Sequence, residues 1–165
     1  MVNSPSHGDA FRLLFVCTGN TCRSPMAEAI ARRRAGELGY DHVEVRSAGV
    51  GASSGSPASG GALRVAEAHG FDLSGHRATL LTEDVAATAD LILTMSPTHL
   101  TRVIDLGAGE RAAILTSYAG GLDDAAGVAI PDPIGGPDEE YEETFRLLDE
   151  LIGRTLERLA PVLSR

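Results

Sequence analysis

Short apolar segments alternate with helix-like segments along this chain, and that alternation restricts its possible folds more than any other feature. The runs "RLLFVC" and "ADLILTM" are apolar almost throughout, which is typical of strands buried on both faces of a sheet. "HVEVRSAG" and "RAAILTS" have the composition of two further strands. The four predicted strands cover residues 12–17, 42–49, 89–95 and 111–117.

A helix is expected after each predicted strand. Ser24 can cap the first helix, Pro25 fits its first turn and Gly39 can end it. Two shorter helices are expected, one ending near His69 and one beginning after Ser96-Pro97. In the closing helix, apolar side chains recur at steps of three and four residues. They are Tyr141, Phe145, Leu148, Ile152, Leu156 and Leu159. This order predicts an α/β fold with three layers, α/β/α, around a four-stranded parallel sheet.

The composition is that of a globular, acidic protein. The chain has 165 residues, 43% hydrophobic and 22% charged, which fits one globular domain over 11–165 after a disordered polar tail over 1–10. Its formal net charge of −9 disfavours nucleic acid or an anionic membrane as a partner, because both attract basic surfaces. No apolar run approaches the roughly 18 residues that cross a bilayer, and the start does not resemble a secretory signal. We therefore expect a cytoplasmic protein.

The segment "FVCTGNTCRSP", residues 15–25, concentrates the residues that carry chemistry. Five residues separate Cys17 from Arg23, between a predicted strand and a predicted helix. Such a loop can turn its backbone N–H groups inward and form an anion-binding concavity at the positive end of the helix. Arg23 adds a planar pair of donors that suits phosphate. Gly19 and Asn20 tolerate the left-handed backbone that a tight curl requires.

Cys17 lies at the base of this predicted concavity, where the same donors would stabilise a thiolate. A thiolate there could attack a bound phosphoryl group and form a cysteinyl-phosphate intermediate. Ser24 could donate its hydroxyl to the sulfur, although a role as helix cap alone would also explain this residue.

The leaving group needs a proton, and the segment "IPDPIGGPDEE" offers a carboxyl group between two prolines, Asp132. Proline restricts the backbone on both sides of this side chain. We expect Asp132 to act first as general acid and then as general base for water. The alternative interpretation is a turn-forming aspartate.

These residues resemble the low-molecular-weight protein tyrosine phosphatase family, whose signature is C-x5-R-[ST] near the N-terminus with an acid on a late Asp-Pro loop. The signature here is "VCTGNTCRSPMAE", and the resemblance continues from about residue 12 through "VRSAG", "GFDLSGHRA" and "ADLILTM". It implies a cysteine-dependent protein phosphatase that acts on phosphorylated proteins without a metal or other cofactor. By match to the motifs, Cys17 is the nucleophile, Arg23 binds phosphate, Ser24 partners the thiolate and Asp132 is the acid.

The resemblance also assigns residues around the nucleophile. Asn20, Ser47 and His76 match residues that hold the loop in shape through a buried hydrogen-bond network. The predicted phosphate-binding loop consists of Thr18, Gly19, Asn20, Thr21 and Cys22.

Two positions bear on the substrate. Thr21 stands where tyrosine-directed members usually carry an apolar residue, and Ile134 stands after Asp-Pro, where they often carry an aromatic one. "CTGNTCRS" and the Asp-Pro loop with its two glycines are similar to the bacterial protein-arginine phosphatases of the family. A guanidinium also prefers a hydroxyl and a carboxylate, such as Thr21 and Asp132, to an aromatic wall. We expect phosphoarginine as the favoured substrate, with phosphotyrosine as the alternative.

Cys22 has two interpretations. The resemblance implies a reversible disulfide with Cys17 that protects the nucleophile from deeper oxidation, whereas the simpler interpretation is a small buried apolar residue. An arsenate reductase of the same fold is a more distant alternative function, disfavoured because the chain has no cysteine after Cys22. A phosphate-binding module without turnover would need neither a nucleophile nor an acid. The five histidines show no metal-ligand spacing, so no metal site is expected.

Overall fold

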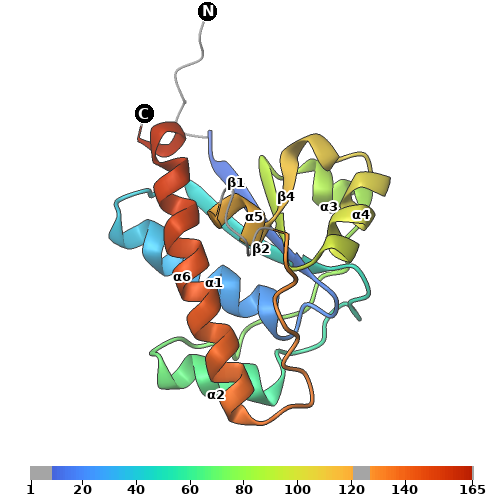
Figure 1. The fold of residues 1–165 in the computed structure, drawn as a ribbon, viewed down its shortest axis with the longest axis vertical. Helices are drawn as coiled ribbons and strands as arrows, with labels where there is room; N and C mark the ends of the chain where they lie inside the picture. Colours follow the sequence, from blue (N-terminus) through green and yellow to red (C-terminus); the bar gives the residue numbers. More distant parts are fainter. Residues whose placement is uncertain (1–8, 121–126, 165) are drawn as a thin grey trace, which may run out of the picture.

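The sheet is parallel throughout. A computed structural model describes residues 9–120 and 127–164 of the chain. Its strands are β1 (Phe11–Cys17), β2 (Val43–Gly49), β3 (Leu91–Thr94) and β4 (Ala112–Ile114). They pair in the order β2-β1-β3-β4, with β1 between β2 and β3 (Figure 1). The predicted four-stranded parallel sheet is confirmed.

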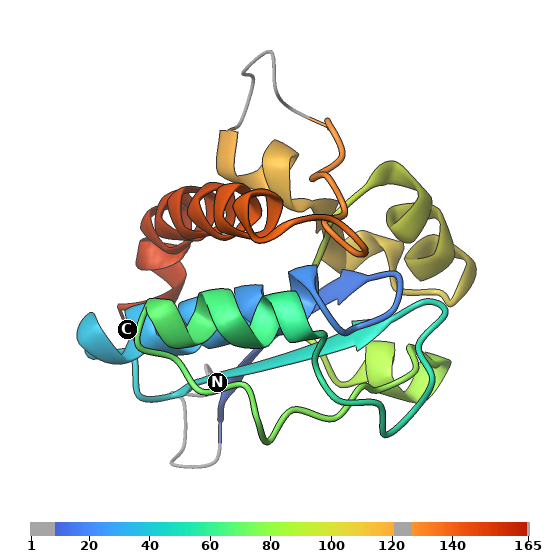
Figure 2. The ribbon, with the colours of Figure 1, turned by 90° about the horizontal axis from the view of Figure 1, so that it is seen from below.

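Helices cover both faces of this sheet, so the predicted three layers are present. On one face, α1 (Arg23–Glu37) lies beside α6 (Asp138–Leu163), as Figures 1 and 2 both show. The same layer holds α2 (Gly60–Ala68) and α5 (Leu115–Gly120). The opposite face is covered by α3 (Glu83–Ala87) and α4 (Pro97–Asp105), and a 3-10 turn at Gly109–Arg111 precedes β4.

Strand β1 supplies both layers of the core, and this explains why its sequence is apolar at successive positions. Leu13 and Phe15 pack with the α1 and α6 layer. Leu14 and Val16, which point to the other face because side chains alternate along a strand, pack with the α3 and α4 layer. Its last residue, Cys17, is therefore held at the carboxyl edge of a central strand, where ligands bind in sheets of this kind.

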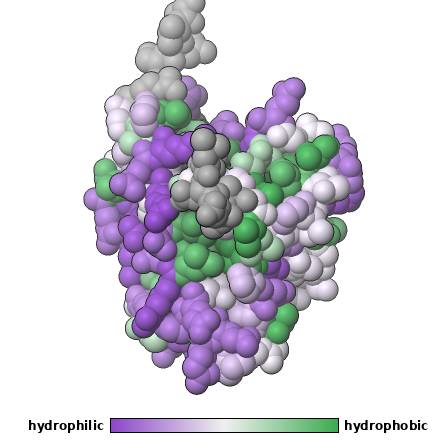
Figure 3. All heavy atoms as spheres, viewed as in Figure 1, coloured by the Kyte–Doolittle hydropathy of each residue, from purple (hydrophilic) through white to green (hydrophobic). Residues whose placement is uncertain are grey.

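The closing helix follows its predicted pattern. All six apolar residues predicted to face the core, from Tyr141 to Leu159, are buried. The first turn of α6 is acidic, with Asp138, Glu139 and Glu140, which suits the positive end of the helix dipole. In the view of Figure 3, the flank formed by α6 is largely hydrophilic, while hydrophobic residues gather toward the middle of that face. Within the described residues, no helix is both long enough and apolar enough to span a membrane.

Some predicted boundaries were wrong. The fourth strand was expected over residues 111–117, but β4 ends at Ile114 and the chain continues as α5 from Leu115, whose side chain is fully buried. A short apolar run suits a strand or a buried helix equally well, so periodicity could not separate the two. Helices α3 and α5 were not predicted at all. The tail predicted over 1–10 lies mostly outside the described residues.

Candidate active site

The loop between β1 and α1 carries the predicted nucleophile. Cys17 is the last residue of β1, residues 18–22 form the loop, and α1 begins at Arg23. The predicted helix cap at Ser24 was wrong, because Cys22 occupies the N-cap position and makes no side-chain capping bond. The first N–H groups of a helix have no partner inside it. Without a side-chain cap, those of α1 remain available to an external acceptor.

Ser24 instead lies inside the first turn of α1 and contacts the cysteine. The Cys17 Sγ and Ser24 Oγ atoms are 2.9 Å apart, and the backbone N–H of Asn20 donates to the same sulfur at 3.3 Å. The side-chain amide of Asn20 donates to Ser24 Oγ at 2.7 Å. Since Ser24 accepts this bond, its own hydroxyl hydrogen is free to point at the sulfur.

Asn20 fixes the curl of the loop. It has a φ of 56°, in the left-handed region, as its residue type suggested. Its Oδ1 accepts the backbone N–H of Thr79 at 2.9 Å, and its carbonyl oxygen lies 2.7 Å from His76 Nε2. On the far side, Gly49 of β2 packs so closely that an added Cβ would lie 2.8 Å from the Asn20 nitrogen. The loop is thus held by residues from two distant segments.

Arg23 is buried, and both Nη atoms of its guanidinium make hydrogen bonds to neighbouring residues. Nη1 donates to the carbonyl oxygen of Ile130 at 2.9 Å, and Nη2 donates to Thr18 Oγ1 at 3.4 Å. The Arg23 Nε atom is a buried donor without a hydrogen-bond partner among the described residues. A buried donor left unpaired is costly, and a bound anion would complete it. Nε and Nη2 lie on one edge of the guanidinium, as bidentate binding of phosphate requires.

Asp132 reaches the same guanidinium. Its Oδ2 lies 3.4 Å from Arg23 Nη2, and its Oδ1 accepts the backbone N–H of Ile134 at 3.1 Å. The Asp132 side chain remains 40% exposed. This Asx-type contact holds the carboxyl group in place at the edge of the site, and the Ile134 side chain beside it is exposed.

These groups line one cavity of about 230 Å³. The loop after β1 and the Asp-Pro segment both contribute to its lining. Its lining residues are Cys17, Thr18, Gly19, Thr21, Cys22, Arg23, Asp132 and Ile134. The fold therefore brings eight of the predicted site residues, Cys17 among them, to one cavity.

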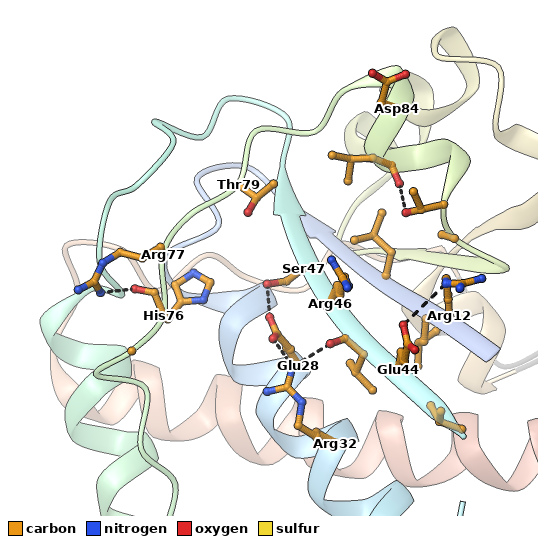
Figure 4. Close-up of a pocket in the computed structure, with 18 residues that line it drawn as sticks. Arg12, Glu28, Arg32, Glu44, Arg46, Ser47, His76, Arg77, Thr79 and Asp84 are labelled. Carbon is orange, nitrogen blue, oxygen red and sulfur yellow. Dashed lines mark hydrogen bonds and ion pairs between the residues drawn. The ribbon is translucent and has the colours of Figure 1, made fainter. Parts of the chain in front are cut away.

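A larger hollow of about 810 Å³ lies elsewhere, along the edge of β2 between α1 and α3 (Figure 4). It contains neither Cys17 nor Arg23, so we place the chemistry in the smaller cavity. Ser47 lines the larger hollow, and its hydroxyl donates to Glu28 of α1 at 2.5 Å. Unlike Asn20 and His76, Ser47 makes its described hydrogen bond to the helix rather than to the loop.

Cys22 takes part in a polar cluster behind the loop. Its Sγ lies 3.1 Å from Ser59 Oγ, next to α2, and 3.5 Å from the Tyr141 hydroxyl on α6. Burial and the hydrogen bond to the Cys22 thiol raise the pKa of the Tyr141 hydroxyl, although its bond to Ser59 acts in the opposite direction. Both Cys17 and Cys22 are free thiols.

His99, on the first turn of α4, contacts the loop although no sequence motif indicated it. The His99 Nε2 atom lies 2.8 Å from Thr18 Oγ1, 81 residues earlier in the chain. Burial and then the nearby charge of Arg23 lower the pKa of His99 to about 4, and the weaker influence of Asp132 opposes them. No spacing in the sequence indicates this contact, because it depends on the pairing of β1 with β3.

Comparisons with known proteins agree with this geometry. A family model described as low molecular weight phosphotyrosine protein phosphatase matches residues 12–163. The protein-arginine-phosphatase of Geobacillus stearothermophilus is 37% identical over 151 residues, which cover 90% of this chain and 96% of that protein. The low molecular weight protein-tyrosine-phosphatase Wzb of Escherichia coli (strain K12) is 34% identical over 152 residues, covering 92% and 95%.

Solved structures have the same fold. The crystal structure of a low molecular weight protein tyrosine phosphatase from T. tengcongensis aligns with a TM-score of 0.82 and 38% identity, covering 91% of this chain and 100% of that chain. The chain therefore belongs to the low molecular weight phosphotyrosine protein phosphatase family.

Proposed function

We propose that this chain hydrolyses phosphorylated protein side chains through a cysteinyl-phosphate intermediate, with phosphoarginine as the preferred substrate. The observation that carries the proposal is the buried Nε of Arg23, unpaired among the described residues, in a cavity also lined by Cys17, whose sulfur already accepts a hydrogen bond from the Asn20 backbone N–H. An oxyanion seated between them would complete the donor and place phosphorus within reach of the sulfur.

In the first step, the Cys17 thiolate attacks phosphorus, an S–P bond forms and the bond to the leaving group breaks. Arg23 and the N–H groups at the start of α1 stabilise the charge on the non-reacting phosphoryl oxygens. Asp132 delivers its proton to the departing nitrogen or oxygen. Its contact with Arg23 Nη2 keeps it at the rim of the cavity, close to where that atom leaves.

In the second step, the Asp132 carboxylate takes a proton from water, and the resulting oxygen nucleophile attacks phosphorus. The S–P bond breaks, inorganic phosphate forms and the thiolate returns. The Ser24 hydroxyl, 2.9 Å from the sulfur, stabilises the anion as it departs. Asp132 leaves this step protonated and can act as the acid in the next cycle.

The preference for phosphoarginine rests on what lines the cavity. Thr21 contributes a hydroxyl and Asp132 a carboxyl group to the lining, and none of the described residues that line the cavity is aromatic. A guanidinium leaving group can donate hydrogen bonds to both, whereas a phenyl ring would gain nothing from them. A protein-arginine-phosphatase and a protein-tyrosine-phosphatase are 37% and 34% identical to this chain, so sequence identity does not decide between the two substrates.

Phosphotyrosine is the second candidate, and Ile134 favours it. This side chain lines the cavity and is 56% exposed, so an aromatic ring could bury apolar surface against it. A single aliphatic contact supports a phenyl ring less than a pair of hydrogen-bonding groups supports a guanidinium.

A comparison of rates tests the proposal. We expect kcat/KM for a phosphoarginine peptide to exceed that for the phosphotyrosine peptide of the same sequence by at least about tenfold. Cys17→Ser should abolish turnover of both peptides and still bind inorganic phosphate, because the donors remain. Hydrolysis by Cys17→Ser at the wild-type rate would remove the cysteine from the reaction.

A variant of Thr21 tests whether this residue sets the substrate preference. Thr21→Ile should shift the ratio of the two activities toward phosphotyrosine by roughly tenfold, because it exchanges a hydroxyl for apolar surface. An unchanged ratio would show that Thr21 does not set the preference.

Regulation by oxidation and a cytoplasmic location complete the proposal. Cys17 and Cys22 line the same cavity as free thiols, so a reversible disulfide between them would silence and protect the nucleophile. A reducing compartment keeps such a pair active.

A further inference from the structure

His99 is a buried polar residue whose imidazole has no structural task in its own helix. The residue is 3% exposed, in the first turn of α4. The helix start is capped by Ser96, whose Oγ accepts the backbone N–H of His99 at 3.4 Å. Any residue would supply that backbone N–H. The cap therefore leaves the imidazole unexplained.

The polar contact of the imidazole goes to the phosphate-binding loop. His99 Nε2 lies 2.8 Å from Thr18 Oγ1, while its Nδ1 is buried without a hydrogen-bond partner among the described residues. An unpaired buried nitrogen costs free energy. An apolar side chain would fill the same space without that cost, so the contact with Thr18 is what the imidazole adds.

The same threonine oxygen contacts the guanidinium. Arg23 Nη2 lies 3.4 Å from Thr18 Oγ1, and because a guanidinium only donates, the hydroxyl accepts. The Thr18 oxygen thus joins the imidazole on one side to the phosphate-binding arginine on the other. Either neutral tautomer of His99 makes this link, as donor or as acceptor.

The charge of His99 suits this role. Arg23 and Asp132 are the charged groups that influence the imidazole, and it stays neutral at physiological pH. A cationic side chain here would repel Arg23 at the phosphate site.

We propose that His99 is a positioning residue, which holds the Thr18 hydroxyl and, through it, the Arg23 guanidinium in the orientation that binds the phosphoryl group. This inference rests on the proposed phosphatase activity. It predicts that His99 and Thr18 act as one unit on phosphate binding and on turnover.

A double-mutant cycle tests the proposal with the full-length chain. We expect His99→Leu and Thr18→Val each to lower kcat/KM for para-nitrophenyl phosphate about tenfold, and to weaken inhibition by inorganic phosphate. The double variant should be no more than about twofold worse than either single variant, because both remove the same link. His99→Gln should restore most of the activity, since its terminal amide reaches the place of Nε2, and Thr18→Ser should do so because it keeps the hydroxyl.

A matched control separates this role from packing. His69 also has a 2.9 Å contact through Nε2, to Glu142, and stacks on Phe145 away from the cavity. His69→Leu should lower the melting temperature while leaving phosphate inhibition unchanged.

The outcomes separate the two proposals. An inactive wild-type protein would refute the phosphatase activity itself. With an active wild type, losses that multiply in the double variant, or a Thr18→Val protein with unchanged kcat/KM and phosphate inhibition, would overturn the role of His99. If His99→Leu does not fold, unchanged kcat/KM and phosphate inhibition in Thr18→Val would still refute the proposed role of His99.

Discussion

Two side chains near Cys17 are held by the backbone of distant segments. The carbonyl of Ile130 accepts a hydrogen bond from Arg23, and the backbone N–H of Thr79 donates to Asn20, whose side-chain amide in turn donates to Ser24 beside the sulfur. Such contacts reduce the motion that the site would otherwise have to lose when it binds a phosphoryl group. The geometry of the cavity therefore depends on residues that do not line it.

The neutral state of His99 makes stability depend on pH. Its pKa is about 4 in the folded protein against 6.5 ordinarily, so as the pH falls through this range the unfolded chain takes up the proton first. Folding is then disfavoured by roughly 2–3 kcal/mol from this group. The free energy of unfolding should fall more steeply between pH 6.5 and 4 in the wild type than in His99→Gln. Chemical denaturation at pH 7 and at pH 4.5 measures the difference, and equal losses in both proteins would contradict the assignment.

At the scale of elements, the end of β2 forms the wall against which the phosphate-binding loop curls. Gly49 pairs with Cys17 across the sheet, and its Cα faces the backbone of the loop at Thr18 and Asn20. A side chain at this position would push the loop outward. The loop takes its shape from a neighbouring strand as well as from its own sequence.

Gly49→Ala tests this contact. The added methyl group would lie against the Thr18 carbonyl oxygen and 2.8 Å from the Asn20 nitrogen. We expect a loss of about 1–3 kcal/mol in the free energy of unfolding, and a fall in kcat/KM of more than tenfold because the loop is displaced.

Gly51→Ala is the matched control, since its added carbon would lie 3.9 Å from the Thr18 carbonyl oxygen, in ordinary contact. It should keep nearly full activity. Equal activities of the two variants would show that the close approach at Gly49 does not shape the loop.

Elements with strong local signals could be predicted from the sequence, and elements that depend on their neighbours could not. The apolar run at β1, the proline at the start of α1 and the periodic face of α6 led to correct assignments. Helix α5 was missed because Leu115 continues the apolar run of β4 and only its burial distinguishes a helix there. The cap at Ser24 was wrong because the helix begins two residues earlier, which leaves the serine hydroxyl to Cys17.

At the scale of the whole molecule, α6 ties the site to the core. Its buried face packs against α1, α2 and α5, and its residue Tyr141 contacts Cys22 and Ser59 at the back of the loop. The helix that completes the hydrophobic core thus also supports the phosphate-binding loop. Loss of its packing should unfold the core and the site together.

Ile152→Ala measures that coupling. Ile152 is fully buried, so its truncation should lower the free energy of unfolding by about 2–5 kcal/mol. The thermal loss of activity and of helical signal should shift together, as in one cooperative unit. Glu150→Ala, which removes an exposed ion pair with Arg154, should change stability by less than about 1 kcal/mol. Activity lost well below the unfolding temperature would show that the site melts separately.

The sequence by itself determined the four parallel strands, four of the helices between and after them, the placement of Cys17 at a strand end and the five-residue spacing between Cys17 and Arg23. These are local properties, because hydrophobic period, proline and glycine act within a few residues. The tertiary structure decided which distant groups complete the site: the Ile130 carbonyl on Arg23, Gly49 against the loop, and His99 on Thr18. Those contacts arise because parallel strands bring their carboxyl ends to one edge of the sheet, and no local pattern records which side chains meet there.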